Sequence, residues 1–192
     1  MRVIYLTQAN KTKELPKRKK LRLKNYNYSQ NGYYFITICT NERCKILGEI
    51  TLVGRDAPGA PLNTPSVFVN DNFYKTSLRL SKYGETVSKE IQETPNHYEG
   101  VVIEKFVVMP NHIHMIITVN RENGAPGASR PTNAMIPIII AGLKKKTNKI
   151  TGLPLWQTSY YDHIIRNENE YWKIWEYIDT NPLRWVYDKY YI

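Results

Sequence analysis

The sequence has few of the residues that build disulfide frameworks, and it has no long apolar segment. Only two cysteines occur among 192 residues, Cys39 and Cys44, and no other cysteine or histidine stands near them. A zinc site needs more ligands and a disulfide framework needs a secreted context, so we expect free thiols in a reducing cytoplasm. The longest apolar run, Ile136 to Ala141, is too short to span a membrane, and the first residues do not resemble a signal peptide.

Acidic residues are also scarce, with 17 Asp and Glu against 27 Lys and Arg, a formal charge of +10 and a pI near 9.5. This balance favours a polyanionic partner, nucleic acid first and acidic membrane second. Residues 11–24 alone carry eight positive charges and one negative charge. They are typical of a solvated arm and equally of a clamp on the DNA backbone, and both can hold because such arms often order on binding.

Seven regular elements are expected from periodicity and from turn and cap residues. We predict strands at 33–40, 101–109, 112–119 and 159–166, and helices at 81–94, 134–148 and 168–181. Residues 43–50 are expected to pair back on the first strand as a hairpin.

The first six of these elements form a β-α-β-β-α-β unit, which predicts an α+β, ferredoxin-like antiparallel sheet with two helices on one face. The remaining C-terminal helix is expected on the open face of the sheet. We expect one domain at 26–192 after a basic N-terminal arm at 1–25. Segments 54–65 and 121–133 break all periodicity and share Ala-Pro-Gly-Ala, so they are expected to be surface insertions.

A histidine pair starts the third predicted strand. Side chains alternate along a strand, so His112 and His114 share one face, while Ile113 and Met115 point to the face under the helices. Two imidazoles about 6–7 Å apart on one face can chelate a single divalent ion. The alternative is that both are ordinary polar residues at a strand start.

The last predicted helix carries a phenol and an amide on one edge of its apolar stripe. Tyr177 and Asn181 are four residues apart and therefore lie one above the other. The alternatives are a packing tyrosine and an asparagine that ends a helix before Pro182. Spacing alone leaves both interpretations open.

The segment Pro110 to His114 closely resembles the His-hydrophobe-His motif of the single-tyrosine HUH transposases, in the branch of REP-associated tyrosine transposases. The resemblance extends, in the family's order, over the blocks 21–37, 155–157, 161–167 and 177–182. It implies that His112, His114 and Asn181 bind Mg²⁺ or Mn²⁺ and that Tyr177 is the nucleophile. The implied fold matches the predicted order of elements.

The family resemblance also implies an activity and a partner. It implies a DNA transposase, acting as a metal-dependent single-strand endonuclease and strand transferase through a 5′-phosphotyrosine intermediate. The expected partner is single-stranded or hairpin DNA, with no membrane, in a bacterial-type cytoplasm in association with the nucleoid. The sequence does not decide between a monomer and a homodimer, or between action of Tyr177 in cis and in trans. It also does not identify the general base or the recognised hairpin, or show whether the element is still mobile.

The DNA backbone is expected to be held by basic residues of the arm and of the second helix. These are Lys17, Arg18, Lys19, Lys20, Arg22, Lys24, Lys144, Lys145 and Lys146. Trp156 and Trp185 could stack on splayed bases, although core packing is the commoner role. His163 follows Asp162 and is expected to make a structural hydrogen bond outside the core site.

Three other functions are compatible with the same residues. A ferredoxin-like sheet with a basic arm can bind single-stranded nucleic acid without cutting it. A metal hydrolase would use water in place of tyrosine and would leave no protein-DNA link. An inactive relative of a transposase is the third, although all four predicted site residues are present.

Overall fold

The computed structural model describes residues 31–54, 66–69, 72–120 and 135–191. The basic arm, with Lys17, Arg18, Lys19, Lys20, Arg22 and Lys24, lies outside these residues. So do the insertion at 121–133 and all but the first residue of the one predicted at 54–65. In the described part of the chain, no helix combines the length and apolar character that crossing a bilayer requires.

The main sheet has four antiparallel strands in the order β5-β6-β1-β7. They are β1 (Gly32–Cys39), β5 (Val101–Met109), β6 (His112–Val119) and β7 (Tyr161–Ile165). The first strand is central and pairs with β6 so that Thr37 lies opposite His114. This order is that of the ferredoxin-like sheet, so the predicted fold class is confirmed.

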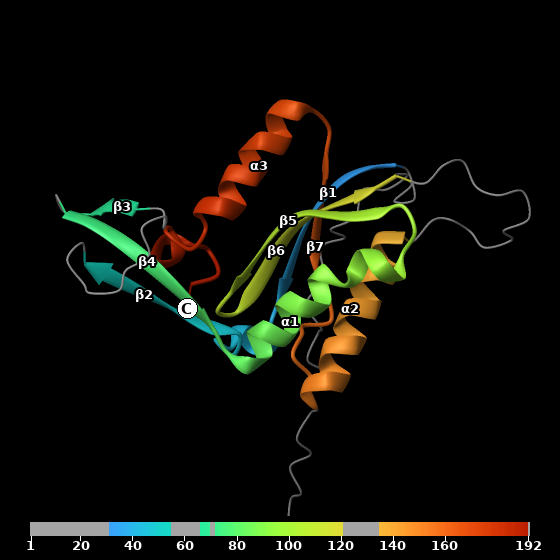
Figure 1. Ribbon diagram of the computed structural model, residues 1–192, viewed down its shortest axis with the longest axis horizontal. Coiled ribbons are helices and arrows are strands. Elements are labelled where there is room, and N and C mark those ends of the chain that lie inside the picture. Colours follow the sequence, from blue (N-terminus) through green and yellow to red (C-terminus); the bar gives the residue numbers. More distant parts are fainter. Residues whose placement is uncertain (1–30, 55–65, 70–71, 121–134, 192) are drawn as a thin grey trace, which may run out of the picture.

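Two helices, α1 (Lys82–Gln92) and α2 (Met135–Thr151), cover one face of this sheet (Figure 1). The first begins at Ser81, whose hydroxyl accepts from two backbone N–H groups of the first turn. The main hydrophobic core lies between these helices and the sheet, and it includes Ile113 and Met115 of β6. The alternation predicted for this strand therefore holds.

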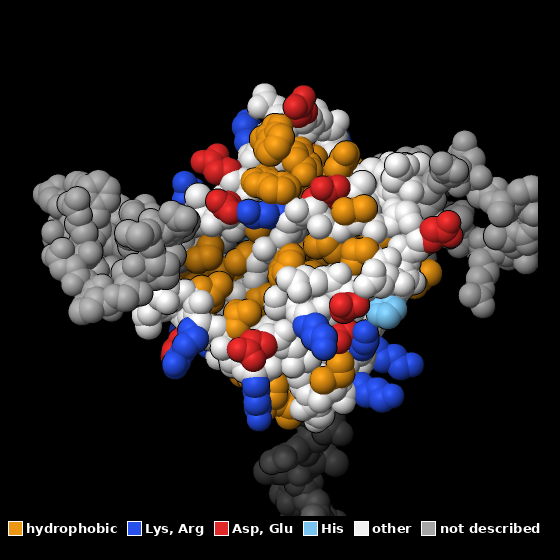
Figure 2. Space-filling view, in the orientation of Figure 1, with side chains coloured by type: hydrophobic (Ala, Val, Ile, Leu, Met, Phe, Trp, Pro, Cys, Tyr) orange, Lys and Arg blue, Asp and Glu red, His pale blue; other side chains and the backbone are white. Residues whose placement is uncertain are grey.

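The third helix, α3 (Glu168–Thr180), lies on the opposite face of the sheet, as predicted (Figure 1). Its contact with the sheet is a separate, smaller cluster whose buried members are Ile116, Ile165 and Ile178. An ion pair of 2.5 Å joins Lys105 of β5 to Asp179 near the end of the helix. Figure 2 shows apolar side chains exposed over α3, whereas Lys and Arg gather over the α1–α2 side.

A second sheet corrects the predicted hairpin. Residues 48–54 do not pair with the first strand, because β2 (Gly48–Gly54) pairs with β4 (Asn72–Leu80), which also pairs with β3 (Ser66–Val69). The physical reason is the short helix η1 (Asn41–Arg43), where Glu42 and Arg43 take left-handed backbone conformations with φ of 51° and 55°. This turn directs the chain away from the main sheet, into a separate three-stranded sheet.

We expect Gly84→Ala to lower the free energy of unfolding by about 1–3 kcal/mol, as overpacking does. In an open helix the same change stabilises by about 1 kcal/mol. Here the new Cβ would overlap the backbone carbonyl oxygen of Leu47, which is buried and cannot withdraw. Urea unfolding measures the change.

Gly142→Ala on α2 is the matched control, because its Cβ would meet only the hydroxyl end of the Tyr98 side chain. That side chain can move, so we expect a smaller loss. A Gly84→Ala protein as stable as the native chain would contradict the close approach of α1 to Leu47.

Candidate active site

Two imidazole rings converge on the face of the sheet that α3 covers. The Nε2 atoms of His112 and His114 lie 3.0 Å apart, and both side chains are buried, with 0% and 1% of their surface exposed. Two ring nitrogens this close either share a proton or donate their lone pairs to one cation. Strand alternation produces this convergence, because Ile113 between them points into the main core.

The outer nitrogen of each ring is held by a neighbour, which fixes the orientation of the ring. Asn111 Nδ2 donates to the backbone carbonyl of Tyr190 at 2.8 Å, so Asn111 Oδ1 faces His112 Nδ1, also at 2.8 Å. An amide oxygen only accepts, so this Nδ1 carries the proton and Nε2 keeps its lone pair. His114 Nδ1 lies 2.8 Å from the hydroxyl of Thr37.

Both histidines are uncharged at neutral pH. Burial is the main cause that lowers the pKa of His112 to about 4. Burial also lowers the pKa of His114 well below its usual range, and the neighbouring His112 lowers it further. Neutral imidazole is the form that ligates metals, so the pair is ready to bind a cation without first losing protons.

The hydroxyl of Tyr177 on α3 reaches this pair within the same chain. It lies 3.2 Å from His114 Nε2, and Phe35 contacts both rings, stacking on His114 and meeting Tyr177 edge-on. Burial raises the pKa of Tyr177, and the Asp188 carboxylate raises it further. The phenol is therefore protonated at neutral pH, and a nearby positive charge would be needed to favour the phenolate.

Asn181 lies beside the tyrosine at the end of α3, with only 1% of its surface exposed. Its Nδ2 donates to Asp188 Oδ2 at 2.9 Å, while its Oδ1 is buried and has no hydrogen-bond partner in the part of the chain that the structure describes. A buried oxygen without a donor costs about 1–3 kcal/mol. A cation next to this oxygen would remove that cost.

Asp188 is the site residue that sequence reasoning missed. One oxygen of its carboxylate and one nitrogen of each histidine lie within 4.8 Å of one another, a grouping that could hold a metal ion. Its Oδ1 accepts from the backbone N–H of Tyr190 at 2.7 Å, which fixes the carboxylate. The tail around it is aromatic and basic in sequence, and Asp188 is its one acidic residue. That isolated carboxylate was the one sequence feature that pointed to a ligand in the tail.

The tail after α3 packs directly on the histidines. It contains the short helix η3 (Trp185–Tyr187), and the rings of Trp185 and Tyr190 lie 6.0 and 4.6 Å from the ring of His112. Trp185 is 5% exposed, and Trp156 is buried with its indole N–H donating to Thr147. Both tryptophans therefore have the core-packing role and do not present free faces to bases.

A cavity of about 430 Å³ opens onto the tyrosine. It is lined by Tyr177, Asn181 and Asp188, and also by Arg184, Tyr187 and Lys189. Two cationic side chains therefore stand beside the phenol, where an incoming phosphate would be attracted.

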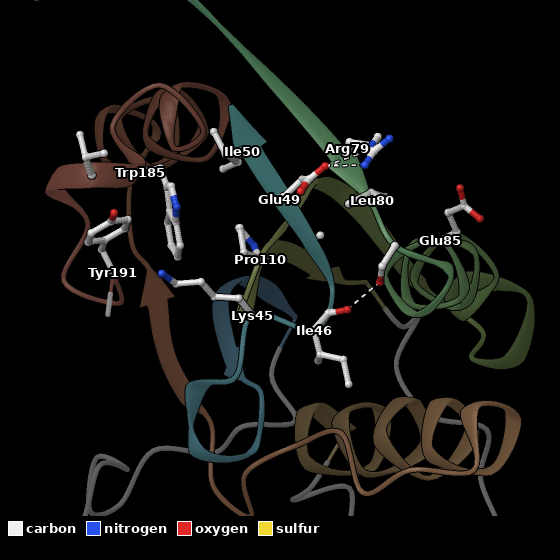
Figure 3. Close-up of a pocket in the computed structure, with 13 residues that line it drawn as sticks. Lys45, Ile46, Glu49, Ile50, Arg79, Leu80, Glu85, Pro110, Trp185 and Tyr191 are labelled. Carbon is white, nitrogen blue, oxygen red and sulfur yellow. Dashed lines mark hydrogen bonds and ion pairs between the residues drawn. The ribbon is translucent and has the colours of Figure 1, made fainter. Parts of the chain in front are cut away.

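A larger cavity of about 880 Å³ lies between the second sheet and the tail (Figure 3). Trp185 and Tyr191 line it from the tail, and the Arg79–Glu49 ion pair lies across it on the second sheet. Because Trp185 also contacts His112, this cavity adjoins the histidine pair. The second sheet, absent from the predicted fold, thus forms one wall of a cavity next to the site.

The structure does not bring the predicted helix lysines to the histidine pair, because α2 lies on the other face of the sheet. Lys144 donates to the carbonyls of residues 157, 158 and 159, at 2.8, 3.2 and 3.0 Å. Lys146 pairs with Glu90 at 2.6 Å, and Lys145 is exposed. His163 pairs with Glu170 at 2.7 Å, the structural role expected of it.

Comparison with known proteins finds relatives in sequence and in fold. An uncharacterized protein of Haemophilus influenzae is 30% identical over 191 residues, covering 91% of this chain and 93% of its own. A REP-associated tyrosine transposase solved bound to a REP hairpin is 19% identical, covering 88% of this chain and 76% of its own, with a TM-score of 0.56. No family model matches the sequence.

A further solved structure, of a candidate transposase from Deinococcus radiodurans, is 15% identical. The match covers 83% of this chain and 97% of that one. Its TM-score of 0.41 is too low to show a shared fold.

We expect the metal-free protein to lose stability as the pH falls from about 6.5 towards 4. Above pH 6.5 the two imidazoles are neutral whether the chain is folded or unfolded. Below it the unfolded chain takes up protons that the folded chain resists, since the folded pKa of His112 is about 4 and its usual value is 6.5. At pH 5 the part of this loss that is due to His112 alone is about 2 kcal/mol.

Urea unfolding at pH 7 and pH 5 in chelator measures this loss. The double variant His112→Gln/His114→Gln lacks the titrating groups and should show a smaller decrease. Equal decreases in the two proteins would show that the imidazoles are not buried in their neutral form.

Proposed function

The chain belongs to one family with the Haemophilus influenzae protein and has the fold of the REP-associated tyrosine transposase, and on that premise we propose that it is a transposase of the single-tyrosine HUH type. The single observation that carries the proposal is the convergence of a phenol on two buried imidazoles, with Tyr177 Oη 3.2 Å from His114 Nε2. The activity proposed is cutting and rejoining of single-stranded DNA.

His112 and His114 are proposed to hold a divalent cation, Mg²⁺ or Mn²⁺, together with oxygen ligands from Asn181 and Asp188. The residues fit such an ion, because two imidazole Nε2 atoms converge, a carboxylate lies within reach and the buried Asn181 Oδ1 has no donor among the described residues. Carboxylate and amide oxygens suit Mg²⁺ and Mn²⁺, and imidazole suits many divalent metals. When bound, the cation supplies positive charge that stabilises charge developing on phosphate oxygens.

Tyr177 is proposed to attack the phosphorus of the scissile phosphate. The phenol oxygen forms a bond to phosphorus and loses its proton, and the bond to the 3′-oxygen breaks, so that oxygen leaves as a 3′-hydroxyl. The product is a 5′-phosphotyrosine, which keeps the energy of the broken bond. Attack by a 3′-hydroxyl of another strand reverses the step and joins DNA without ATP.

The cavity in front of Tyr177 is proposed to receive the phosphate. Arg184 and Lys189 line it and attract the anion, while Phe35 packs edge-on to the Tyr177 ring and limits where the phenol can point. We propose this opening as the entrance for the phosphate because Tyr177 lines it, whereas the histidines themselves are buried. We propose that a single strand presents its backbone there.

The proposed substrate is therefore single-stranded or hairpin DNA, and the solved structure of similar fold was itself bound to a REP hairpin. The chain's charge of +10 favours such a polyanion. The basic arm, with the Lys and Arg residues at 17–24, and the exposed Lys145 on α2 are proposed contacts to the backbone. The insertions at 54–65 and 121–133 are proposed to alter which DNA is chosen.

We expect Tyr177→Phe to abolish the covalent protein-DNA adduct, because phenylalanine keeps the ring and lacks the oxygen that attacks. The measurement is a denaturing gel of labelled hairpin oligonucleotide with protein and Mn²⁺. Tyr187→Phe is the matched control, since Tyr187 lines the same cavity and is 74% exposed.

Three results would overturn the proposal in different ways. Nicking by Tyr177→Phe would exclude this nucleophile. Nicking by the native chain without any adduct would indicate a water-using hydrolase. Binding without nicking would leave a nucleic-acid-binding module.

We expect Asp188→Asn to weaken Mn²⁺ binding by about tenfold or more, because it removes the only negative charge in the ligand group while keeping its size. Asn181→Ala is expected to weaken binding by a smaller factor. Titration calorimetry measures both, and Asp179→Asn is the control, since that carboxylate pairs with Lys105 on the far side of α3. Unchanged affinity in Asp188→Asn would remove the tail carboxylate from the ligand set.

A further inference from the structure

A third cavity, about 450 Å³ in volume, lies where α3 begins. It is lined by Tyr33, Ile165, Arg166, Asn167, Glu168, Tyr171 and Trp172. Aromatic rings dominate it, and two of them are unusually open, with Tyr33 42% and Trp172 55% exposed. Figure 2 shows apolar side chains gathered over this end of α3. Large rings exposed together in a hollow mark a binding site more often than a chance surface.

The rings are held firmly, which suits them for stacking. Tyr171 meets Tyr33 edge-on at 5.2 Å and Trp172 at 5.2 Å, so each exposed ring is supported by a partly buried neighbour. The Trp172 indole N–H donates to the Glu168 carboxylate at 3.3 Å, which limits rotation of the ring. A ligand that stacks here therefore loses little free energy to ordering the side chains.

The charged residues that line this cavity indicate the chemistry of its ligand. The Arg166 guanidinium and the Glu168 carboxylate both line the pocket, and both residues are exposed. The carboxylate would accept from the amino group of a base, whereas the guanidinium would attract the phosphate next to that base. Exposed aromatic rings with one cation and one acceptor beside them match an unpaired nucleobase and its phosphate.

The position relative to Tyr177 is consistent with one continuous strand. Edge strand β7 runs from Tyr161, whose ring lies 5.7 Å from the ammonium of Lys189, to Ile165 in the pocket wall. Four residues of strand span about 13 Å, which is about four stacked nucleotides at ~3.4 Å per step. Lys189 lines the cavity in front of Tyr177, so this edge connects the two cavities.

We propose that this aromatic pocket binds an unpaired nucleobase of the single-stranded DNA a few nucleotides from the phosphate that Tyr177 attacks. The inference rests on the proposed function for its substrate class. It adds a site for base stacking that is separate from the histidine pair.

The test measures binding alone, using the full chain carrying Tyr177→Phe so that cutting cannot interfere. Fluorescence anisotropy gives Kd for a short single-stranded oligonucleotide, with and without Trp172→Ala. We expect binding to weaken about 5- to 100-fold, as loss of one stacked base does. Trp172→Phe should restore most of the affinity because it keeps an aromatic face.

Salt dependence separates stacking from contact with phosphate. Loss of a phosphate contact changes the slope of log Kd against log salt, whereas loss of stacking shifts Kd by one factor at every salt concentration. Ile150→Ala is the matched control, since Ile150 on α2 is 53% exposed and lies on the other side of the sheet. It should leave Kd unchanged.

Photocrosslinking locates the base. Oligonucleotides with a single 5-iodouracil should crosslink to the peptide containing Tyr171 and Trp172 from only one or two positions along the strand. Equal crosslinking from every position, or unchanged Kd in Trp172→Ala, would overturn the pocket. A homodimer that Trp172→Ala dissociates would also overturn it, by showing that a second copy covers the rings.

The outcomes distinguish this pocket from the proposed function. If the native chain forms an adduct at Tyr177 but its DNA binding does not depend on Trp172, only the proposed base-binding pocket is contradicted. Trp172-dependent binding with no adduct would remove only the transposase chemistry. No binding of single-stranded DNA by the native chain would remove both.

Discussion

The meeting of two imidazole nitrogens at 3.0 Å in a buried layer is the constraint on which the rest of the site depends. Such a pair is stable only when both rings stay neutral and each outer nitrogen has a partner. The central strand supplies Thr37, and the turn before β6 supplies Asn111, which in turn holds the tail through Tyr190. The strand order of the sheet, the turn and the tail thus all converge on one pair of rings.

The two faces of the main sheet carry different kinds of side chain. One face carries the main core under α1 and α2, and its side chains on β6 are uniformly apolar. The other face carries polar and aromatic groups under α3, held by a much smaller apolar cluster. Alternation along a single strand therefore separates the residues that stabilise the fold from those proposed to act on DNA.

Much of this arrangement could be predicted, because it follows from local periodicity. The alternation around His112 and the apolar stripe of the last helix locate both groups, and strand order then brings the helix to the open face. The carboxylate of Asp188 could not be predicted, because it reaches the histidines only when the tail folds back. The second sheet was missed because no strand was predicted over residues 66–80, and because the turn at Glu42 and Arg43 has no sequence signature of its own.

The division into two apolar clusters has a consequence for assembly. Because α3 is attached by a few contacts of its own, its release would leave the larger core closed. Two copies of the chain could then exchange this helix, so that Tyr177 of each copy lies beside the two histidines of the other. The rest of each fold would persist. The geometry at the rings would be the same whether the helix comes from the same copy or from the other one. Which form the protein takes would therefore depend on the connections on either side of α3, at Arg166–Asn167 and Pro182–Leu183.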